Sequence, residues 1–175
     1  MKKSLFVIIS FFIVQFAYSQ ENFQWDSVYI SPKSKQILYS DIKMFVAKTW
    51  NSANDVIQND DKENGQILIK GIENINGSTT FNPFKLTFNY TVVFSIKENK
   101  CRLEIKDVYC TKFIMGNYNR SSGFPLSEVY PGLNATAMGE SKYFETTKKL
   151  KDALQIIETN FGVEINKPSS ISTDW

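Results

Sequence analysis

Apolar and polar residues alternate most regularly between Phe84 and Ile96. Every even position of this segment is apolar, and all but one of the odd positions are polar. A period of two over this length predicts a β-strand with one buried face. Glu98 and Asn99 follow as the predicted tip of a hairpin.

The alternation resumes at Cys101 and predicts the second strand of this hairpin, which we extend to Met115. Residues that face each other across a hairpin lie on the same side of the sheet, so the apolar pattern sets the register. The predicted pairs are Ile96 with Cys101, Phe94 with Leu103, Val92 with Ile105 and Phe88 with Tyr109.

Two other segments carry apolar residues at spacings of three and four, which predicts helices over 34–50 and 141–161. Ser141 is the expected N-cap of the second helix, and Gly162 is its expected C-terminal glycine. The predicted buried stripes are Ile37, Leu38, Ile42, Phe45, Val46 and Trp50 in the first helix, and Phe144, Leu150, Leu154, Ile157 and Phe161 in the second.

Shorter patterns complete the chain. Residues 23–30, 55–58 and 66–72 are predicted strands, whereas the polar segments 73–83 and 116–139 are predicted loops. The order β-α-β-β-β-β-α, with five strands and two amphipathic helices, predicts a two-layer α+β sandwich.

The first 19 residues have the form of a secretory signal peptide. Two lysines precede an apolar run over 5–16, and Ala17 and Ser19 place small residues at a cleavage site. The run is shorter than the roughly 20 apolar residues of a membrane-spanning helix. We therefore expect cleavage after Ser19, a periplasmic or secreted location and no membrane span afterwards. The expected domains are a signal peptide (1–19), one α+β domain (20–162) and a mobile polar tail (163–175).

The chain has no histidine and two cysteines among its 175 residues. This composition excludes Ser-His-Asp and Cys-His catalytic arrangements and the usual zinc sites, and we expect no metal and no cofactor. Removal of Lys2 and Lys3 with the signal peptide leaves 18 basic and 18 acidic residues. A neutral domain has no general field that attracts nucleic acid or anionic lipid.

The middle of the chain resembles a known family. The residues that carry this resemblance are Trp50, Ser52-Ala53-Asn54-Asp55-Val56-Ile57-Gln58, Asp61, Gly65-Gln66-Ile67 and Lys70-Gly71. They are similar to the bacterial domain of unknown function 4468 (DUF4468), which has a TATA-binding-protein-like (TBP-like) fold, and the resemblance covers about Val28 to Met115. It implies a curved antiparallel sheet with both helices on one face, and it implies no activity.

The fold name does not imply nucleic-acid binding. A minor-groove saddle needs basic residues and apolar wedges on its free face. In the predicted register the free face carries charges of mixed sign, so we expect no nucleic-acid partner. Those residues are Lys85, Thr87, Asn89, Thr91, Val93 and Ser95 on one strand, and Arg102, Glu104, Lys106, Val108, Cys110 and Lys112 on the next.

The predicted loop over 116–139 is the candidate binding segment. It contains Tyr118, Arg120, Phe124 and Tyr130, and aromatic residues with arginine are enriched at binding hot spots. Long loops on rigid scaffolds often carry function. The alternative is a loop that covers a sheet edge or the core, with Phe124 and Tyr130 as its anchors.

Cys101 and Cys110 lie on one predicted strand and point to opposite faces. Nine residues of strand span about 30 Å, far beyond the ~7 Å between the Cα atoms of bridged cysteines. We therefore expect no disulfide within the chain, a buried Cys101, and a Cys110 on the other face. An intermolecular bridge through Cys110 stays open.

Two groups of carboxylates have plain structural interpretations. Asp60, Asp61 and Glu63 lack the spacing of a calcium loop, and we expect a solvated turn. Asp107 falls on the apolar parity of its strand, opposite Tyr90. We interpret it as a residue of a bulge or sheet margin rather than as an acid or base.

These patterns favour a non-catalytic binding module of the cell envelope. It would present the 116–139 loop, together with the free sheet face, to an envelope protein or a glycan. Two alternatives stay open: a carboxylate-based envelope hydrolase, which would need an Asp/Glu pair, and a structural envelope subunit.

Overall fold

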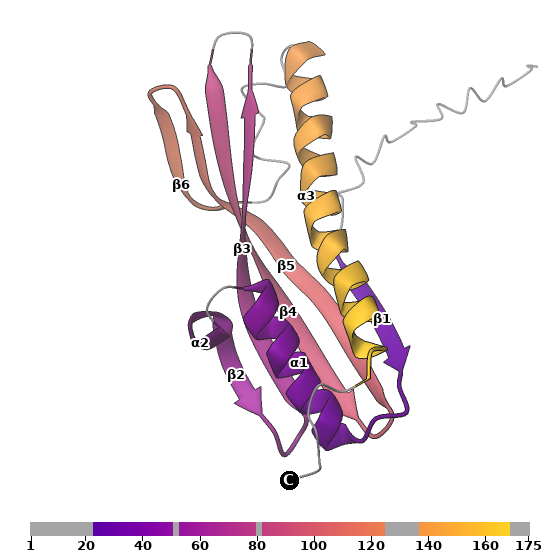
Figure 1. Cartoon of the computed structure of the whole chain (residues 1–175). Helices are drawn as coiled ribbons and strands as arrows, with labels where there is room; N and C mark the ends of the chain where they lie inside the picture. The colour runs from indigo at the N-terminus through magenta and orange to yellow at the C-terminus, as the bar shows by residue number, and fades with distance from the viewer. Residues whose placement is uncertain (1–22, 51–52, 80–81, 125–136, 169–175) are drawn as a thin grey trace, which may run out of the picture.

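The computed structural model describes residues 23–50, 53–79, 82–124 and 137–168. Figure 1 shows a long antiparallel sheet with helices α1 and α3 side by side on one face. The predicted two-layer α+β sandwich is thus confirmed, with six strands instead of five. The elements are β1 (Trp25–Ile30), α1 (Lys35–Thr49), α2 (Ala53–Val56), β2 (Ile57–Asp61), β3 (Gln66–Ser78), β4 (Pro83–Lys97), β5 (Lys100–Met115), β6 (Tyr118–Phe124) and α3 (Ala137–Ile165).

Strands β1 and β6 pair, one after the other, with the same edge of β5. β1 lies opposite residues 100–105, and β6 lies opposite residues 110–115. We call the two parts of the sheet the proximal half and the distal half. The proximal half comprises β1, β2, β3 66–69, β4 92–97 and β5 100–105; the distal half comprises β3 70–78, β4 83–91, β5 106–115 and β6.

Strand β5 carries two β-bulges, one next to the boundary between these halves and one within the distal half. Asp107 and Val108 together face Tyr90, and Thr111 is the extra residue between the pairs Phe88–Cys110 and Thr87–Lys112. Bulges bend a strand and increase its twist. As a result, β1 and β6 lie on opposite sides of the molecule, although both continue from one edge of β5 (Figure 1).

The bulges also change the register predicted for β4 and β5. The pairs of Ile96, Phe94 and Val92 are confirmed, but Phe88 pairs with Cys110 instead of Tyr109. Asp107 has φ +54°, a left-handed conformation that Asp tolerates better than most residues. It therefore occupies a bulge, one of the two positions expected for it. After this bulge the residues that face the core change from odd to even positions. Cys110 is therefore buried on the same face as Cys101, and the prediction that it lies on the other face is wrong.

Aromatic rings hold the two helices on the sheet. Phe161 of α3 contacts Phe45 of α1 at a ring-centroid distance of 5.2 Å and Phe94 of β4 at 5.0 Å. Tyr29 of β1 packs edge-on against Phe161 at 5.0 Å. Because rings from four elements meet here, this cluster is the centre of the core.

Helix α1 follows its predicted pattern closely. Leu38, Ile42, Phe45 and Val46 are buried, and the Ser34 hydroxyl accepts the Ile37 N–H as an N-cap. Such a cap satisfies one of the backbone donors left free in the first turn of a helix.

Helix α3 is longer than predicted at both ends. It begins at Ala137 rather than at Ser141, and it continues through Gly162 to the buried Ile165. Gly162 does not end the helix but leaves room for Tyr29, because a Cβ there would lie 3.0 Å from Cε1 of that ring. Phe144, predicted to be buried, is 61% exposed. The expected tail therefore begins after Ile165, and residues 169–175 lie outside the described residues.

Three segments differ from their predicted structure. Residues 53–56 form the short α2 before β2, residues 73–78 extend β3, and residues 118–124 form β6. Glycines mark the extension of β3: a Cβ at Gly77 would lie 2.2 Å from Cζ of Phe84. The glycines that suggested a loop thus give space to aromatic rings of the neighbouring strand.

None of the helices in the described ranges is long and apolar enough to cross a membrane. The expected signal peptide, residues 1–19, lies outside these ranges.

Candidate functional site

The β5–β6 hairpin carries three of the four predicted binding residues. Tyr118 is 52% exposed, and its ring lies 5.6 Å from that of Phe113. Arg120 is half-buried and lies directly opposite Phe113. Tyr118 and Arg120 therefore share the inner face of the hairpin, because residues paired across strands point to the same side.

The other two predicted positions are less informative. Phe124 ends β6, where its backbone pairs with Cys110. Tyr130 lies outside the described residues. The expected loop is thus a strand over its first part, so that Tyr118 and Arg120 belong to the sheet itself.

The opposite face of the same hairpin carries Tyr109. This tyrosine pairs with Asn89 on the outer face of the sheet, the face away from the helices, and is 36% exposed. Its ring lies against Gly123, where a Cβ would be only 3.2 Å from Cδ2 of the tyrosine. The glycine therefore lets the ring lie close to β6. The sequence missed this residue because the predicted register turned it into the core.

The outer face of the distal half is rich in lysine. Lys70 and Lys106 flank the buried Thr91 on either side of β4. Farther along the face lie Lys85 and Lys112, with Lys112 opposite Thr87. Lys70 Nζ donates a hydrogen bond to Thr91 Oγ1 at 2.7 Å. Among the described residues, no carboxylate forms a salt bridge with any of these four lysines.

The carboxylates of the outer face lie instead in the proximal half. Arg102 donates two hydrogen bonds to Asp26, one from Nε at 2.7 Å, and also lies 3.5 Å from Glu104. The hydrogen bond from Arg102 holds the pKa of Asp26 below its ordinary value. The outer face is thus divided into a charge-paired proximal half and a cationic distal half.

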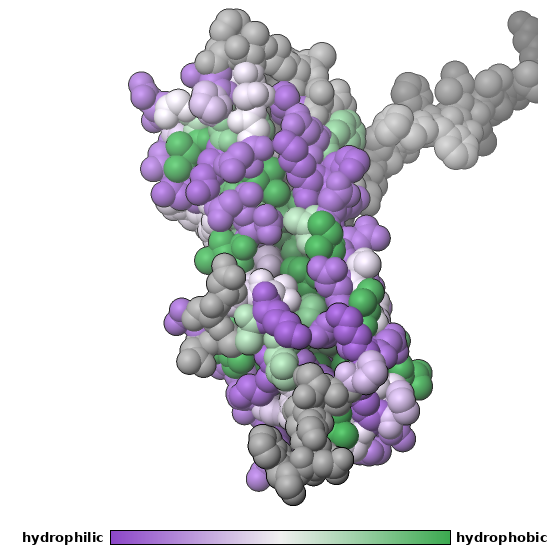
Figure 2. Space-filling model, in the orientation of Figure 1, coloured by the Kyte–Doolittle hydropathy of each residue, from purple (hydrophilic) through white to green (hydrophobic). Residues whose placement is uncertain are grey.

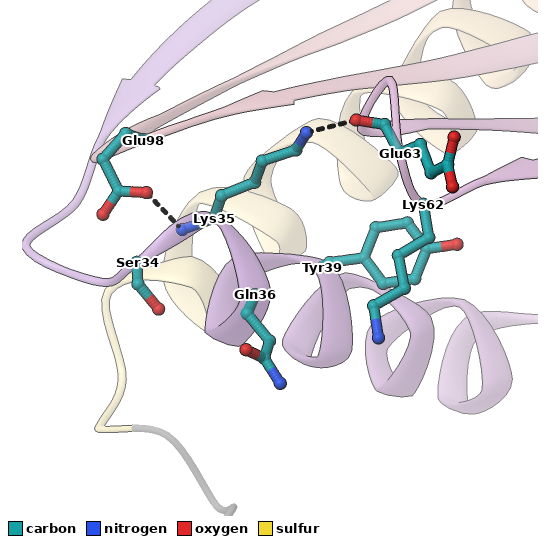
Figure 3. Close-up of a pocket in the computed structure, with 7 residues that line it drawn as sticks. All are labelled: Ser34, Lys35, Gln36, Tyr39, Lys62, Glu63 and Glu98. Carbon is teal, nitrogen blue, oxygen red and sulfur yellow. Dashed lines mark hydrogen bonds between the residues drawn. The ribbon is translucent and has the colours of Figure 1, made fainter.

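An open pocket of about 580 Å³ lies at the proximal end of the molecule, at the start of α1 (Figure 3). The Lys35 backbone N–H donates to Glu98 Oε2 at 3.0 Å, and its Nζ donates to the Glu63 carbonyl at 2.6 Å. Glu98 therefore occupies the position where a helix N-terminus would receive an anionic ligand. The pocket lies between the start of α1 and two hairpin turns. Because its polar groups bond to one another, we do not assign it a ligand. Its lining residues are Ser34, Lys35, Gln36, Tyr39, Lys62, Glu63 and Glu98.

The neighbouring acidic turn is also held by internal partners. Asp60 accepts hydrogen bonds from the Tyr39 hydroxyl and from Lys43 Nζ, the latter at 2.7 Å. Asp61 accepts from both the backbone and the side chain of Asn64, and these bonds lower its pKa. No cluster of carboxylate or thiol groups able to hold a metal occurs in the described part of the chain.

The two cysteines are free thiols within the core. Burial raises the pKa of Cys101 and that of Cys110 to about 11. Thiolates are the reactive form of cysteine, so neither residue is poised for nucleophilic chemistry.

Glu73 is the carboxylate that most resembles a catalytic group. It lies half-buried on the inner face of β3, and burial raises its pKa. Close by in the core, Trp50 Nε1 donates to the Tyr90 hydroxyl at 3.1 Å. In the described parts of β3, β4 and β5, the inner face holds no second carboxylate. The sequence missed Glu73 because its segment was predicted to be a loop.

Comparison with known proteins identifies the family. The family described as a domain of unknown function (DUF4468) with TBP-like fold matches residues 25–111. No curated protein matches the chain.

Two solved structures share the fold. A DUF4468 family protein from Bacteroides ovatus ATCC 8483 is 15% identical with a TM-score of 0.56, over 85% of this chain and 89% of that one. A TBP-like protein from Parabacteroides distasonis ATCC 8503 is 11% identical with a TM-score of 0.53, over 79% of this chain and 91% of that one. The family match and the shared fold agree: over residues 25–111, this chain belongs to the DUF4468 family of domains with a TBP-like fold.

Proposed function

We propose that the chain is a non-catalytic binding module that is exported to the periplasm or secreted, and that the β5–β6 hairpin is its main contact surface. The lysines at the N-terminus, the apolar run over 5–16 and the small residues before Gln20 support export. The partner is a protein or a glycan of the cell envelope.

The observation that carries this proposal is the pair of tyrosines on the hairpin. Tyr118 lies on its inner face and Tyr109 on its outer face, and they are 52% and 36% exposed. Exposed tyrosines on rigid strands lose little conformational entropy on binding, which makes them effective contact residues. Helix α3 packs against β1 and β3, while the main neighbour of β6 is β5. The hairpin thus extends away from the helical layer (Figure 1).

The arrangement of carboxylates favours binding over hydrolysis. Glycosidases use two carboxyl groups about 5–9.5 Å apart. Glu73 is single on its sheet face within the described strands, and both thiols are buried. Within the described strands, hydrolysis would thus lack a second carboxylate on the face of Glu73, whereas the aromatic groups that binding would need are exposed.

Site-specific photo-crosslinking in the native host tests this proposal. A benzophenone amino acid replaces Tyr118 in the full chain, and the matched control carries it at Ile156, which is 57% exposed on α3. We expect a defined adduct from position 118 and none from position 156. Arg120→Ala should weaken the adduct, because Arg120 lies on the same face.

Three outcomes would contradict the proposal. One is the absence of any adduct at position 118, and another is equal labelling at both positions. The third is an adduct formed only with a second copy of the chain, which would favour a structural envelope subunit. Mass spectrometry of the same material tests export, since the expected mature chain begins at Gln20.

A further inference from the structure

We propose that the outer face of the distal half binds an acidic polysaccharide. This inference names the ligand class of the proposed binding module and so rests on that proposal. It arises from four lysines, an exposed tyrosine ring and a row of amide and hydroxyl side chains on one sheet face. The sequence predicted three of these lysines on this face, but it did not place Lys70 or Tyr109 there.

The charges on this face favour an anionic ligand. Lys70, Lys85, Lys106 and Lys112 form no salt bridge within the described ranges. The single carboxylate in this stretch of β5 is Asp107, at the bulge. Because the carboxylates of the proximal half are already bound to Arg102, they do not neutralise the lysines.

The tyrosine ring supplies a surface for the apolar side of a sugar. The ring of Tyr109 rests against the Gly123 backbone and stays 36% exposed. Ile72 lies in the same row of the sheet, two strands away, and is 61% exposed. Between them lies Asn89, whose side chain can exchange hydrogen bonds with sugar hydroxyls.

Neighbouring polar side chains extend this row. The Thr87 hydroxyl bonds to Asn74 Oδ1 at 2.9 Å, and the Thr111 hydroxyl bonds to the Thr87 carbonyl at 3.1 Å. These bonds hold the side chains in place, while the amide nitrogen of Asn74 remains a donor for a ligand. The face therefore offers ordered hydrogen-bonding groups rather than flexible ones.

The spacing of the lysines favours a polymer of charged sugars. Lys70 and Lys106 are two strands apart, or about 10 Å, and the row of Lys112 lies about 13 Å farther along β4. Tyr109, Asn89 and Ile72 fill the interval between them. Along this face a pair of lysines is followed by the tyrosine row and then by Lys112. A polysaccharide whose anionic groups are separated by sugar rings matches this order. Duplex DNA and anionic bilayers present denser charge, and their non-specific binding depends mainly on charge.

Binding of the mature protein to polygalacturonate and chondroitin sulfate, with dextran as the neutral polymer, tests the inference. Lys70→Gln/Lys106→Gln should weaken binding about tenfold, a loss of ~1.4 kcal/mol. The matched control Lys62→Gln/Lys97→Gln removes the same charge from exposed positions at the proximal end, in the turn after β2 and at the end of β4, and it should bind like the wild type. Tyr109→Ala should also weaken binding, whereas Tyr109→Phe, which keeps the ring, should not.

The outcomes separate this inference from the proposed function. Failure to bind either acidic polymer, or equal binding to dextran, overturns the inference. It is also overturned if phosphatidylglycerol vesicles or duplex DNA bind as tightly and Tyr109→Ala has no effect. If these assays are negative but a crosslinked partner forms at position 118, the ligand class is wrong and the binding module stands. Failure of both experiments removes both proposals.

Discussion

The ring of Tyr90 occupies the space that a side chain at position 71 would need. A Cβ added to Gly71 would lie 2.1 Å from Cζ of Tyr90, the residue directly opposite on β4. The same tyrosine accepts a hydrogen bond from Trp50 at the end of α1. The Tyr90 ring therefore lies over β3 at Gly71, and its hydroxyl connects the sheet to the helical layer through Trp50.

Gly71→Ala should destabilise the protein by roughly 1–3 kcal/mol, because overpacking forces a ring or a strand to move. Urea denaturation of both proteins measures the free energy of unfolding. The control is the same substitution in a Tyr90→Ala background, where the ring is absent and the extra cost should largely disappear. An equal cost in both backgrounds would show that contact with Tyr90 is not the cause.

Phe161→Ala should lower the free energy of unfolding by about 3–5 kcal/mol, the usual cost of removing a buried phenylalanine. Its ring is fully buried and contacts Tyr29, Phe45 and Phe94. On the exposed side of the same helix, Ile156→Ala should change stability by less than about 0.5 kcal/mol. Similar losses in the two variants would mean that α3 packs with a different face.

Neither cysteine of the folded protein should react with a thiol reagent at about pH 8. Both are buried, and burial raises the pKa of each thiol to about 11. Mass spectrometry after alkylation should find both thiols unmodified in the native protein and both modified in urea. Ile72→Cys, which adds a thiol at an exposed outer position, should react readily. Rapid modification of native Cys110 would contradict its burial and would favour the register predicted from the sequence, in which Cys110 lies on the outer face.

Glu73→Gln should stabilise the protein more at neutral pH than at acidic pH. Burial raises the pKa of Glu73 above its ordinary value of 4.5. The folded protein accommodates the neutral, protonated carboxyl better than the carboxylate. The contribution of Glu73 to the free energy of unfolding is therefore full below its unfolded pKa and is lost as pH rises through its folded pKa. The advantage of Glu73→Gln over the wild type, from urea titrations across this range, should therefore grow with pH. An advantage that falls with rising pH would be contrary to a buried carboxyl.

Glu145→Gln should show the opposite dependence. Hydrogen bonds from Lys142 and Lys149 lower the pKa of Glu145 to about 2. Its stabilising contribution is present above 4.5 and is lost as pH falls toward 2, so the variant should be less stable than the wild type at neutral pH only. Because the carboxyl is exposed, added salt should reduce the difference. A difference that persists unchanged at the acidic end would show another cause.

The sequence predicted those parts of the fold that local patterns determine. The alternation from Phe84 to Ile96 gave β4, and the apolar spacing after Ser34 gave α1. The register of β4 with β5 in the proximal half followed from the same alternation. It failed at Asp107, because a bulge shifts the phase of a strand and no single residue type there announces it.

The candidate site was harder to predict for the same reason. Once the phase shifts, Tyr109 lies on the outer face and Cys110 in the core. Glu73 escaped notice because the asparagines and glycines around it are typical of loops, although here they pair with β4. The sequence did identify Tyr118 and Arg120 as candidates, but it could not show that they share a strand and a face.

The pairing of β1 with β5 also determines the order in which the chain can fold. Val28 pairs with Arg102, so β1 leaves the ribosome long before its partner strand is made. The strands from β3 to β6 each pair with the next one along the chain, and such local contacts form fastest. The meander can therefore assemble first, while β1 waits with its apolar residues unpaired. During synthesis and any transport that follows, Trp25 and Tyr29, the β1 side chains that pack against the core of the folded protein, stay exposed and are the natural target of a chaperone.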